Sequence, residues 1–199
     1  METELLEIIR QVKNGEEEAC YGLFRMFKTR IYHICLGILG DSFLASDATQ
    51  EAFIKMFRSI KGLRKPEKFY IWFCRLAINT ALDKKRKANR ECVLPLEEES
   101  AHFAEPAPKH FERDELRRQI GKAMRALPGL FSSAIILREI EGLSYRGISK
   151  ILKCSIGTVR SRIYRARNLL KEKLIELGCK MPTPPEEEKA ERNSELSLY

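Results

Sequence analysis

The chain has 199 residues, of which 44% are hydrophobic and 32% are charged, and its formal net charge is +8. A chain of this length and composition can form one or two small domains with buried cores. The positive charge suggests a polyanion as a partner.

The sequence shows no targeting signal, no membrane-spanning segment and no metal-binding motif. The N-terminal METELLEIIR is acidic and amphipathic, unlike a signal peptide, and the mostly apolar stretch 31–39 is shorter than the ~20 residues that span a bilayer. The six cysteines include no pair separated by two to four residues, the spacing typical of zinc ligands. We therefore expect a cytoplasmic protein that has no metal site and no other cofactor.

The first 90 residues carry a helical pattern throughout. Apolar residues recur every three or four positions, which predicts helices at about 5–13, 16–39, 46–60 and 69–90. Asn14-Gly15 and Gly40-Asp41 are expected to end the first two helices, and the segment 61–68, KGLRKPEK, is expected to be a loop. Alternation typical of strands is not sustained over four positions.

The rest of the chain divides into a linker, a second helical domain and a tail. Residues 91–112 contain three prolines and the run Glu97–Glu99, which indicates a flexible acidic linker. Helices are expected from about 113 to 127, 131 to 141 and 145 to 152, followed by a long one after Ser155. Residues 179–199 should form a disordered acidic tail. The predicted class is all-α, with domains at 1–90 and 113–178.

The segment 142–174 has the pattern of a helix-turn-helix, as in winged-helix-like DNA-binding domains. Ser144 and Ser155 can cap its two helices, which are separated by Lys153-Cys154-Ser155. The second helix places Arg160, Ser161, Tyr164 and Arg165 away from its apolar stripe, and such side chains can contact guanine edges and phosphates. The alternative is a solvated basic helix hairpin that packs on a core.

Taken in order, the motifs resemble one family. SDATQEAFIKMFRSI, FYIWFCRLAINTALDKKRKANR, LPGLFSSAIILREIEGLSYRGISKIL and SIGTVRSRIYRARNLLKEKL are similar to motifs of bacterial RNA polymerase sigma factors, in the extracytoplasmic-function (ECF) group of the sigma-70 family. The resemblance extends from Glu16 to about Leu177, although the linker matches in composition only.

The resemblance implies a polymerase-binding helix in the first domain. Similar positions in the family meet the clamp helices of core RNA polymerase, whose β and β′ subunits are the expected partners. The expected contacts are Asp47, Gln50, Glu51 and Ile54. Carboxylates and an amide on one helix face suit a basic, hydrogen-bonding partner. The alternative interpretation is an ordinary solvated helix face.

The resemblance also implies a helix that reads the promoter −10 element and helps to melt it. The expected DNA contacts are Trp72, Arg75, Asn79, Lys84, Arg86 and Arg90, with Trp72 partly in the core. Strand opening requires an apolar or aromatic surface surrounded by cations. The loop 61–68 occupies the position at which the family captures a flipped base, and it is more basic here than we expect of the family.

In the second domain the resemblance implies recognition of the −35 element. The expected contacts are Arg160, Ser161, Tyr164 and Arg165, with Tyr145 and Thr158 on the DNA backbone. Gly147 and Lys153 depart from the family pattern, because family members often have an acid at the first position and glycine at the second. Neither departure removes the motif.

The leading hypothesis is therefore a sigma factor with core polymerase, promoter DNA and a cognate anti-sigma factor as partners, and with no small-molecule substrate. The acidic linker would follow the RNA exit path of the polymerase or act as a plain spacer. A stand-alone helix-turn-helix regulator whose N-terminal half senses a ligand or dimerises is the alternative. We do not expect an enzyme or a catalytic residue, because His33, His102 and His110 have no nearby set of catalytic partners in the sequence.

Overall fold

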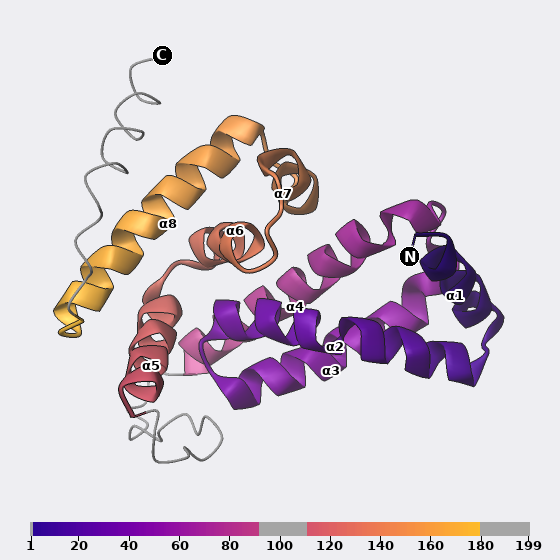
Figure 1. The fold of residues 1–199 in the computed structure, drawn as a ribbon, viewed down its shortest axis with the longest axis horizontal. Coiled ribbons are helices and arrows are strands. Elements are labelled where there is room, and N and C mark those ends of the chain that lie inside the picture. Colours follow the sequence, from indigo (N-terminus) through magenta and orange to yellow (C-terminus); the bar gives the residue numbers. More distant parts are fainter. Residues whose placement is uncertain (1, 92–110, 180–199) are drawn as a thin grey trace.

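The computed structural model describes residues 2–91 and 111–179, and every regular element within them is a helix (Figure 1). The α-helices are α1 (Glu2–Asn14), α2 (Glu17–Leu39), α3 (Ser42–Ser59), α4 (Phe69–Glu91), α5 (Phe111–Ala126), α6 (Gly129–Glu139), α7 (Tyr145–Leu152) and α8 (Ile156–Glu176). Two short 3-10 helices, η1 (Ile60–Gly62) and η2 (Pro66–Lys68), connect α3 to α4. The predicted all-α class is confirmed. Residues 2–91 and 111–179 contain no strand, so the helix-turn-helix has no β wing there.

Helices α1–α4 form one group, here called the N-terminal bundle, around an aromatic and aliphatic core. The predicted stripe of α2 is buried, with Leu23, Ile31 and Ile38 fully inaccessible to solvent. Phe53 of α3 and Phe73 of α4 meet edge to face with their ring centroids 5.0 Å apart. Burial of such side chains is the main stabilising contribution, at about 1.5–3 kcal/mol for each large apolar side chain.

Helices α1, α3, α5 and α6 begin earlier than the periodicity predicted, and hydrogen bonds at the N-termini of α3 and α6 explain two of these differences. Helix α3 was expected from about residue 46 but begins at Ser42, because the Asp41 carboxylate accepts a hydrogen bond from Leu44 N at 2.8 Å and caps the helix. Gly40 ends α2 in a left-handed conformation with φ of 66°, so a two-residue turn separates the helices. Helix α6 begins at Gly129 rather than 131, because the Pro128 carbonyl already accepts from Phe131 N at 2.9 Å.

Helices α5–α8 form the C-terminal bundle, which contains the predicted helix-turn-helix. Ser144 caps α7 by accepting from Gly147 N at 3.2 Å, and Ser155 caps α8 by accepting from Thr158 N at 3.0 Å. Both caps and the break between the helices match the prediction. The two helices pack through a shared apolar seam, which consists of Ile148, Ile151, Val159, Ile163 and Ala166.

The break between α7 and α8 contains backbone strain that a substitution can relieve. Lys153 is the C-cap of α7 with φ of 50°, a left-handed conformation that is unfavourable for a residue with a Cβ atom. Its side chain is exposed. We expect Lys153→Gly to raise the free energy of unfolding by about 1 kcal/mol in urea denaturation. Lys153→Ala is the control, since it removes the same side chain but keeps the Cβ atom, and an equal gain in both variants would contradict this explanation.

The two bundles pack directly against each other, which the sequence did not predict. Helix α2 contacts α5 and α6, and α4 contacts α6 and α7, as Figure 1 shows. Glycines permit the close approach. A Cβ atom at Gly37 of α2 would lie 2.5 Å from Ile136 Cδ1 of α6, and one at Gly129 would lie 2.3 Å from Leu82 Cδ2 of α4. We call the contact between the bundles the domain interface.

Polar groups also cross the domain interface. The Lys85 ammonium donates to the carbonyl of Ile38 at 3.0 Å and to that of Leu127 at 2.8 Å, and burial lowers the pKa of Lys85 to about 8. The Tyr70 hydroxyl donates to the Glu141 carboxylate. The bonds to Leu127 and to Glu141 join α4 to the C-terminal bundle, while the bond to Ile38 joins α4 to α2, so the relative position of the bundles is fixed by polar as well as apolar contacts.

Most of the expected linker and nearly all of the expected tail lie outside the described residues.

Within 2–91 and 111–179, no helix is both long enough and apolar enough to cross a membrane.

Candidate nucleic-acid interface

Helix α8 presents the polar side chains that the sequence singled out. Arg160, Ser161, Tyr164 and Arg165 are all exposed, and the Tyr164 side chain is 64% accessible even though it is aromatic. The opposite side of the helix is buried through Val159 and Ile163. The apolar seam therefore holds α8 in place while its N-terminal half faces solvent, which is the geometry of a helix that enters a major groove.

The hydroxyl groups at the start of α8 are partly committed to the protein. The Thr158 hydroxyl lies 2.8 Å from Ser155 Oγ, and the Ser161 hydroxyl donates to the Thr158 carbonyl at 3.0 Å. Because a hydroxyl has two lone pairs, Ser161 can still accept a hydrogen bond. Thr158 is half-buried, so less of its side chain is accessible to a partner than at the exposed positions Arg160 and Ser161.

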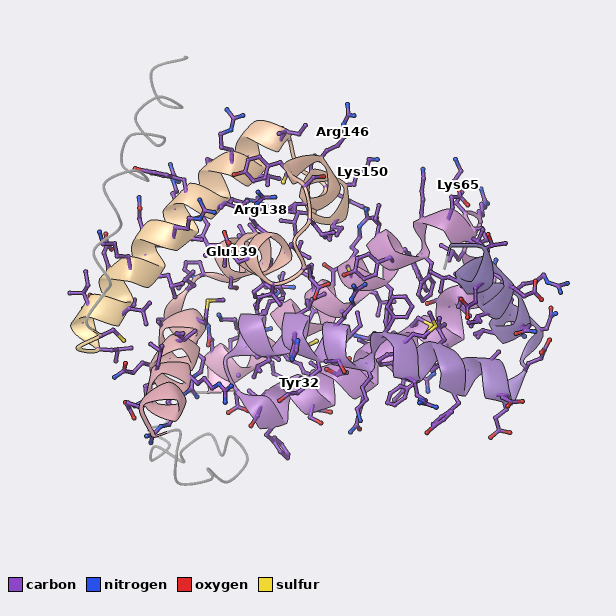
Figure 2. The ribbon with its side chains drawn as sticks, in the orientation of Figure 1. Tyr32, Lys65, Arg138, Glu139, Arg146 and Lys150 are labelled. Atoms are coloured by element: carbon purple, nitrogen blue, oxygen red, sulfur yellow. The ribbon has the colours of Figure 1, made fainter. Side chains whose placement is uncertain are left out.

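Helix α7 adds two cations that the sequence analysis did not single out. Arg146 and Lys150 are exposed, four residues apart on one side of α7, and Figure 2 shows both side chains projecting outward. The i, i+4 spacing was the signal that could have found them. The predicted backbone contact Tyr145 is half-buried, with the Arg138 guanidinium 5.2 Å from its ring centroid. The basic surface thus covers both helices of the motif.

Helix α4 carries the predicted −10 residues, five of them along one stripe. Trp72, Arg75, Asn79, Arg86 and Arg90 follow one another at three, four, seven and four residues, which places them on one side of the helix. Asn79, Arg86 and Arg90 are exposed, and Trp72 is half-buried with its ring 5.9 Å from that of Phe69. Arg86 pairs with Asp83 on the same helix, an exposed contact that a stronger partner can replace.

Arg75, a member of this stripe, takes part in the domain interface. Its guanidinium donates to the carbonyl of Lys150 at 2.6 Å and to that of Ile151 at 3.1 Å, in the last turn of α7. These carbonyls have no partner within their own helix, and a cation is favourable at a helix C-terminus. In this arrangement Arg75 binds the C-terminal bundle, and the donors on its Nε and Nη2 edge are engaged by α7.

Helix α3 carries the predicted polymerase-binding residues on one side. Asp47 and Gln50 are exposed, Glu51 is half-buried, and the Ile54 side chain is 50% accessible. Phe43 lies one turn before Asp47 on the same side and is 81% accessible, the highest value among the exposed large hydrophobic residues. An exposed apolar residue at each end of a polar cluster is typical of a protein-binding surface. We call Phe43, Asp47, Gln50, Glu51 and Ile54 the α3 surface.

Lys84 lies away from the stripe of α4 and against the α3 surface. Its ammonium forms salt bridges with Asp47 at 2.5 Å and with Glu51 at 2.9 Å, and Lys55 pairs with Glu51 at 2.7 Å. Hydrogen bonds from Lys55 and Lys84 hold the pKa of Glu51 below its usual value, while the bond to Asp47 raises that of Lys84. Lys84 was predicted to contact DNA, but here it neutralises the carboxylates predicted to contact the polymerase.

The described residues contain no group of three histidine, cysteine or acidic side chains that could hold a metal ion. The charged side chains described above form three clusters. Those on the helix-turn-helix and on α4 are mainly cationic, and the one on the α3 surface contains both cations and carboxylates. The candidate site comprises these three charged surfaces, which lie on two linked helical bundles.

Comparison with known families identifies both bundles. A model described as sigma-70 region 2 matches residues 23–91, and a model described as sigma-70, region 4 matches residues 117–170. Among curated proteins, the RNA polymerase sigma-H factor of Pseudomonas aeruginosa is 34% identical over 178 residues, which cover 84% of this chain and 92% of that protein. The ECF RNA polymerase sigma factor SigW of Bacillus subtilis is 32% identical over 187 residues, which cover 89% of this chain and all of that protein.

Two solved structures are similar in fold. The sigma factor RpoE from Bartonella quintana, solved in complex with the anti-sigma factor NepR, matches 77% of this chain and 95% of its own with a TM-score of 0.62 and 23% identity. CnrH, solved in complex with the cytosolic domain of CnrY, matches 86% of this chain and 97% of its own with a TM-score of 0.61 and 19% identity. These two likenesses support the fold.

Proposed function

The chain belongs to the ECF group of sigma-70 family RNA polymerase sigma factors, and from this membership we propose how its surfaces divide the work of promoter-specific initiation. The protein is a sigma factor, which binds core RNA polymerase and promoter DNA. The observation that carries this conclusion is the presence of both family regions, in order, in a chain that matches its relatives over nearly their full length. A stand-alone regulator is not favoured, because its N-terminal half would not need to be sigma region 2.

The N-terminal bundle is assigned to core binding and to the −10 element. In this proposal the α3 surface contacts the β and β′ subunits through Asp47, Gln50, Glu51 and Ile54, since its carboxylates and apolar residues suit a basic partner with an apolar centre. The exposed stripe of α4 contacts the −10 element. Trp72 offers an aromatic surface on the same side of α4 as Asn79 and Arg86, and a row of aromatic, polar and cationic side chains can hold an unpaired strand.

The C-terminal bundle is assigned to the −35 element. Arg160 and Arg165 would read base edges from α8, while Arg146 and Lys150 of α7 would add phosphate contacts. Residues 1–90 and 113–178 are thus the two functional domains, and 91–112 connects them. The sigma factor would perform no chemistry of its own, because the polymerase forms the phosphodiester bonds, and it would act in the cytoplasm with that enzyme.

The domain interface implies that the bundles separate before promoter binding. Arg75 uses Nε and Nη2, one edge of its guanidinium, to bond the Ile151 and Lys150 carbonyls, so it cannot present that edge to DNA while the bundles are closed. We propose that the closed arrangement is the free form and that polymerase favours an extended one. Since both structural neighbours were solved in complex with a protein partner, one of which is called an anti-sigma factor, an anti-sigma factor is also a proposed partner of this chain.

The experiment that tests the proposed function is run-off transcription. Core polymerase from the source organism is combined with this protein on genomic fragments that include the region upstream of its own coding sequence. Discrete products that require both core polymerase and this protein would support the proposal. A protein that fails to bind core polymerase but protects a palindromic site by itself would instead support the regulator hypothesis.

Arg160→Ala is expected to reduce initiation at promoters that depend on the −35 element by roughly 5- to 150-fold. This range corresponds to the loss of one good bidentate base contact, which contributes about 1–3 kcal/mol. The readout is run-off product at subsaturating holoenzyme. Lys171→Ala is the matched control, because Lys171 is an exposed cation of the same helix outside its N-terminal half. Equal losses in the two variants would show a general effect of charge and contradict a specific role of Arg160.

A further inference from the structure

Helix α1 lies before residue 23, where the match to sigma-70 region 2 begins, and it contacts the segment between α3 and α4. One side of α1 is anchored in the core of the N-terminal bundle, with Ile9 fully buried and Val12 4% accessible. The same helix contacts α2, η1 and η2. Helix α1, which lies outside the residues matched to sigma-70 region 2, therefore supports the segment 61–68.

Lys13 makes a direct polar contact between α1 and this segment. Its ammonium donates to the Leu63 carbonyl at 2.6 Å, although the two residues are 50 positions apart. Leu63 N donates to the Ile60 carbonyl at 3.0 Å. Both backbone polar groups of Leu63 are thus engaged, and its side chain packs against the core. The backbone at Leu63 is fixed by α1 on one side and by η1 on the other.

The two residues that follow Leu63 carry cationic side chains that face solvent. Arg64 and Lys65 are exposed, and Figure 2 shows Lys65 projecting outward beside α1 and α4. The segment also carries Lys61 and Lys68 against the one acid Glu67. It leads directly into α4, where Trp72 begins the stripe assigned to the −10 element. Cations beside an aromatic surface are the combination that binds unpaired nucleic acid.

We propose that Lys13 is a positioning residue for −10 recognition. By holding the Leu63 carbonyl, Lys13 keeps the segment 61–68 in the conformation that presents Arg64 and Lys65 to the unpaired strand. This inference rests on the proposed assignment of the N-terminal bundle to the −10 element. Lys13 does not contact the strand in this proposal, so its effect is on how precisely the segment reads the base.

The test uses Lys13→Met in the full-length protein reconstituted with core polymerase. Methionine keeps an apolar stem of similar length but leaves the Leu63 carbonyl without its donor. Binding is measured to a single-stranded oligonucleotide that carries the −10 sequence, to the same strand with each −10 base replaced, and to duplex −35 DNA. We expect the affinity for the matched −10 strand to fall roughly tenfold or more, the loss expected for one charge-assisted hydrogen bond. Discrimination against replaced bases should fall with it, while affinity for −35 DNA and for core polymerase stays constant.

Two further variants separate positioning from charge and from folding. Lys13→Arg keeps a donor and should restore most of the discrimination. Arg10→Met removes a cation from the same helix, where Arg10 pairs with nearby Glu7, and should behave like the wild type. If Arg10→Met lowers −10 affinity as much as Lys13→Met does, charge explains the effect and the proposal is overturned.

The remaining outcomes are equally decisive. If the wild-type holoenzyme shows no preference for any −10 strand, the proposed function of the N-terminal bundle fails. If the wild type discriminates and Lys13→Met discriminates equally well, the positioning role fails while the proposed function stands. A lower melting temperature with unchanged discrimination would mean that Lys13 has only a structural role, and it would also overturn the proposal.

Discussion

Replacing Gly37 with leucine is expected to shift the protein from the closed to an extended arrangement. A Cβ atom at this position would lie 2.5 Å from Ile136 Cδ1 and 2.7 Å from Ile136 Cγ1, and Ile136 is 1% accessible, so it has no room to move. Overpacking of this kind costs about 1–3 kcal/mol, which is roughly a 5- to 150-fold change in the closing equilibrium. The measurement is the distance between fluorophores on α3 and α8, together with the radius of gyration in solution.

Gly22→Leu is the matched control for this prediction. Gly22 is in the same helix, but a Cβ atom there would meet nothing within 4 Å. Both variants increase the helix propensity of α2 by a similar amount, so only Gly37→Leu should change the distance between the bundles. The extended variant should also bind −10 DNA without polymerase more tightly than the wild type does, since Arg75 is released. Identical distances in the two variants would contradict a tight domain interface.

Asp47→Lys is expected to lower the affinity for core RNA polymerase by two orders of magnitude or more. The substitution places a cation on the α3 surface, opposite a partner that we expect to be basic, and juxtaposed like charges cost several kcal/mol. The Asp47 side chain is 56% accessible, so the fold should tolerate the change. The measurement is the dissociation constant for core polymerase by fluorescence anisotropy, with the melting temperature as a check on folding.

Glu18→Lys provides the comparison for the polymerase prediction. Glu18 is an exposed acid of α2 outside the α3 surface, and its reversal changes the net charge by the same amount. Its affinity for core polymerase should remain within about twofold of the wild type, because exposed charges away from a contact interact weakly. A comparable loss in both variants would mean that net charge controls binding, and the assignment of the α3 surface would be wrong.

The sequence predicted the helices well because each has a local cause. The apolar stripe of α2, the caps Ser144 and Ser155, and the break at Lys153 all depend on neighbours in the chain, and the structure contains each of them. The early start of α3 was missed because Gly40-Asp41 was interpreted only as the end of a helix, whereas Asp41 also caps the next one. One residue pair served both purposes, and periodicity alone does not reveal this.

The contacts between distant segments could not be predicted from a single sequence. Periodicity shows that a helix has a polar side, but it does not show which other segment covers that side. Arg75 has the pattern of a DNA contact, yet it donates to carbonyls 75 and 76 positions away in the chain. Gly37 and Gly129 resemble ordinary small residues until the facing side chains are known. The residue types of the candidate site were predictable, whereas their present partners were not.

Lys84 of α4 pairs with Asp47 and Glu51, so the proposed DNA-binding helix and the proposed polymerase-binding surface share one cation. Its ammonium is held by Asp47 and Glu51, which are the carboxylates proposed to meet the polymerase. If core polymerase binds the α3 surface as proposed, those carboxylates turn to a cationic partner, and Lys84 loses both salt bridges while it remains on the same helix as Asn79 and Arg86. One more mobile cation would then become available for promoter DNA. The slope of log affinity against log salt should accordingly be steeper for holoenzyme, by roughly the one counterion that an additional phosphate contact releases.

This exchange of partners is a form of cooperativity. If core polymerase increases the affinity of the sigma factor for DNA by releasing Lys84, promoter DNA must increase the affinity for core polymerase by the same factor, because the coupling free energy is reciprocal. A holoenzyme on its promoter would then hold its sigma subunit more tightly than one free in solution does. Escape from the promoter would remove that additional stabilisation at the moment when the subunit has to leave.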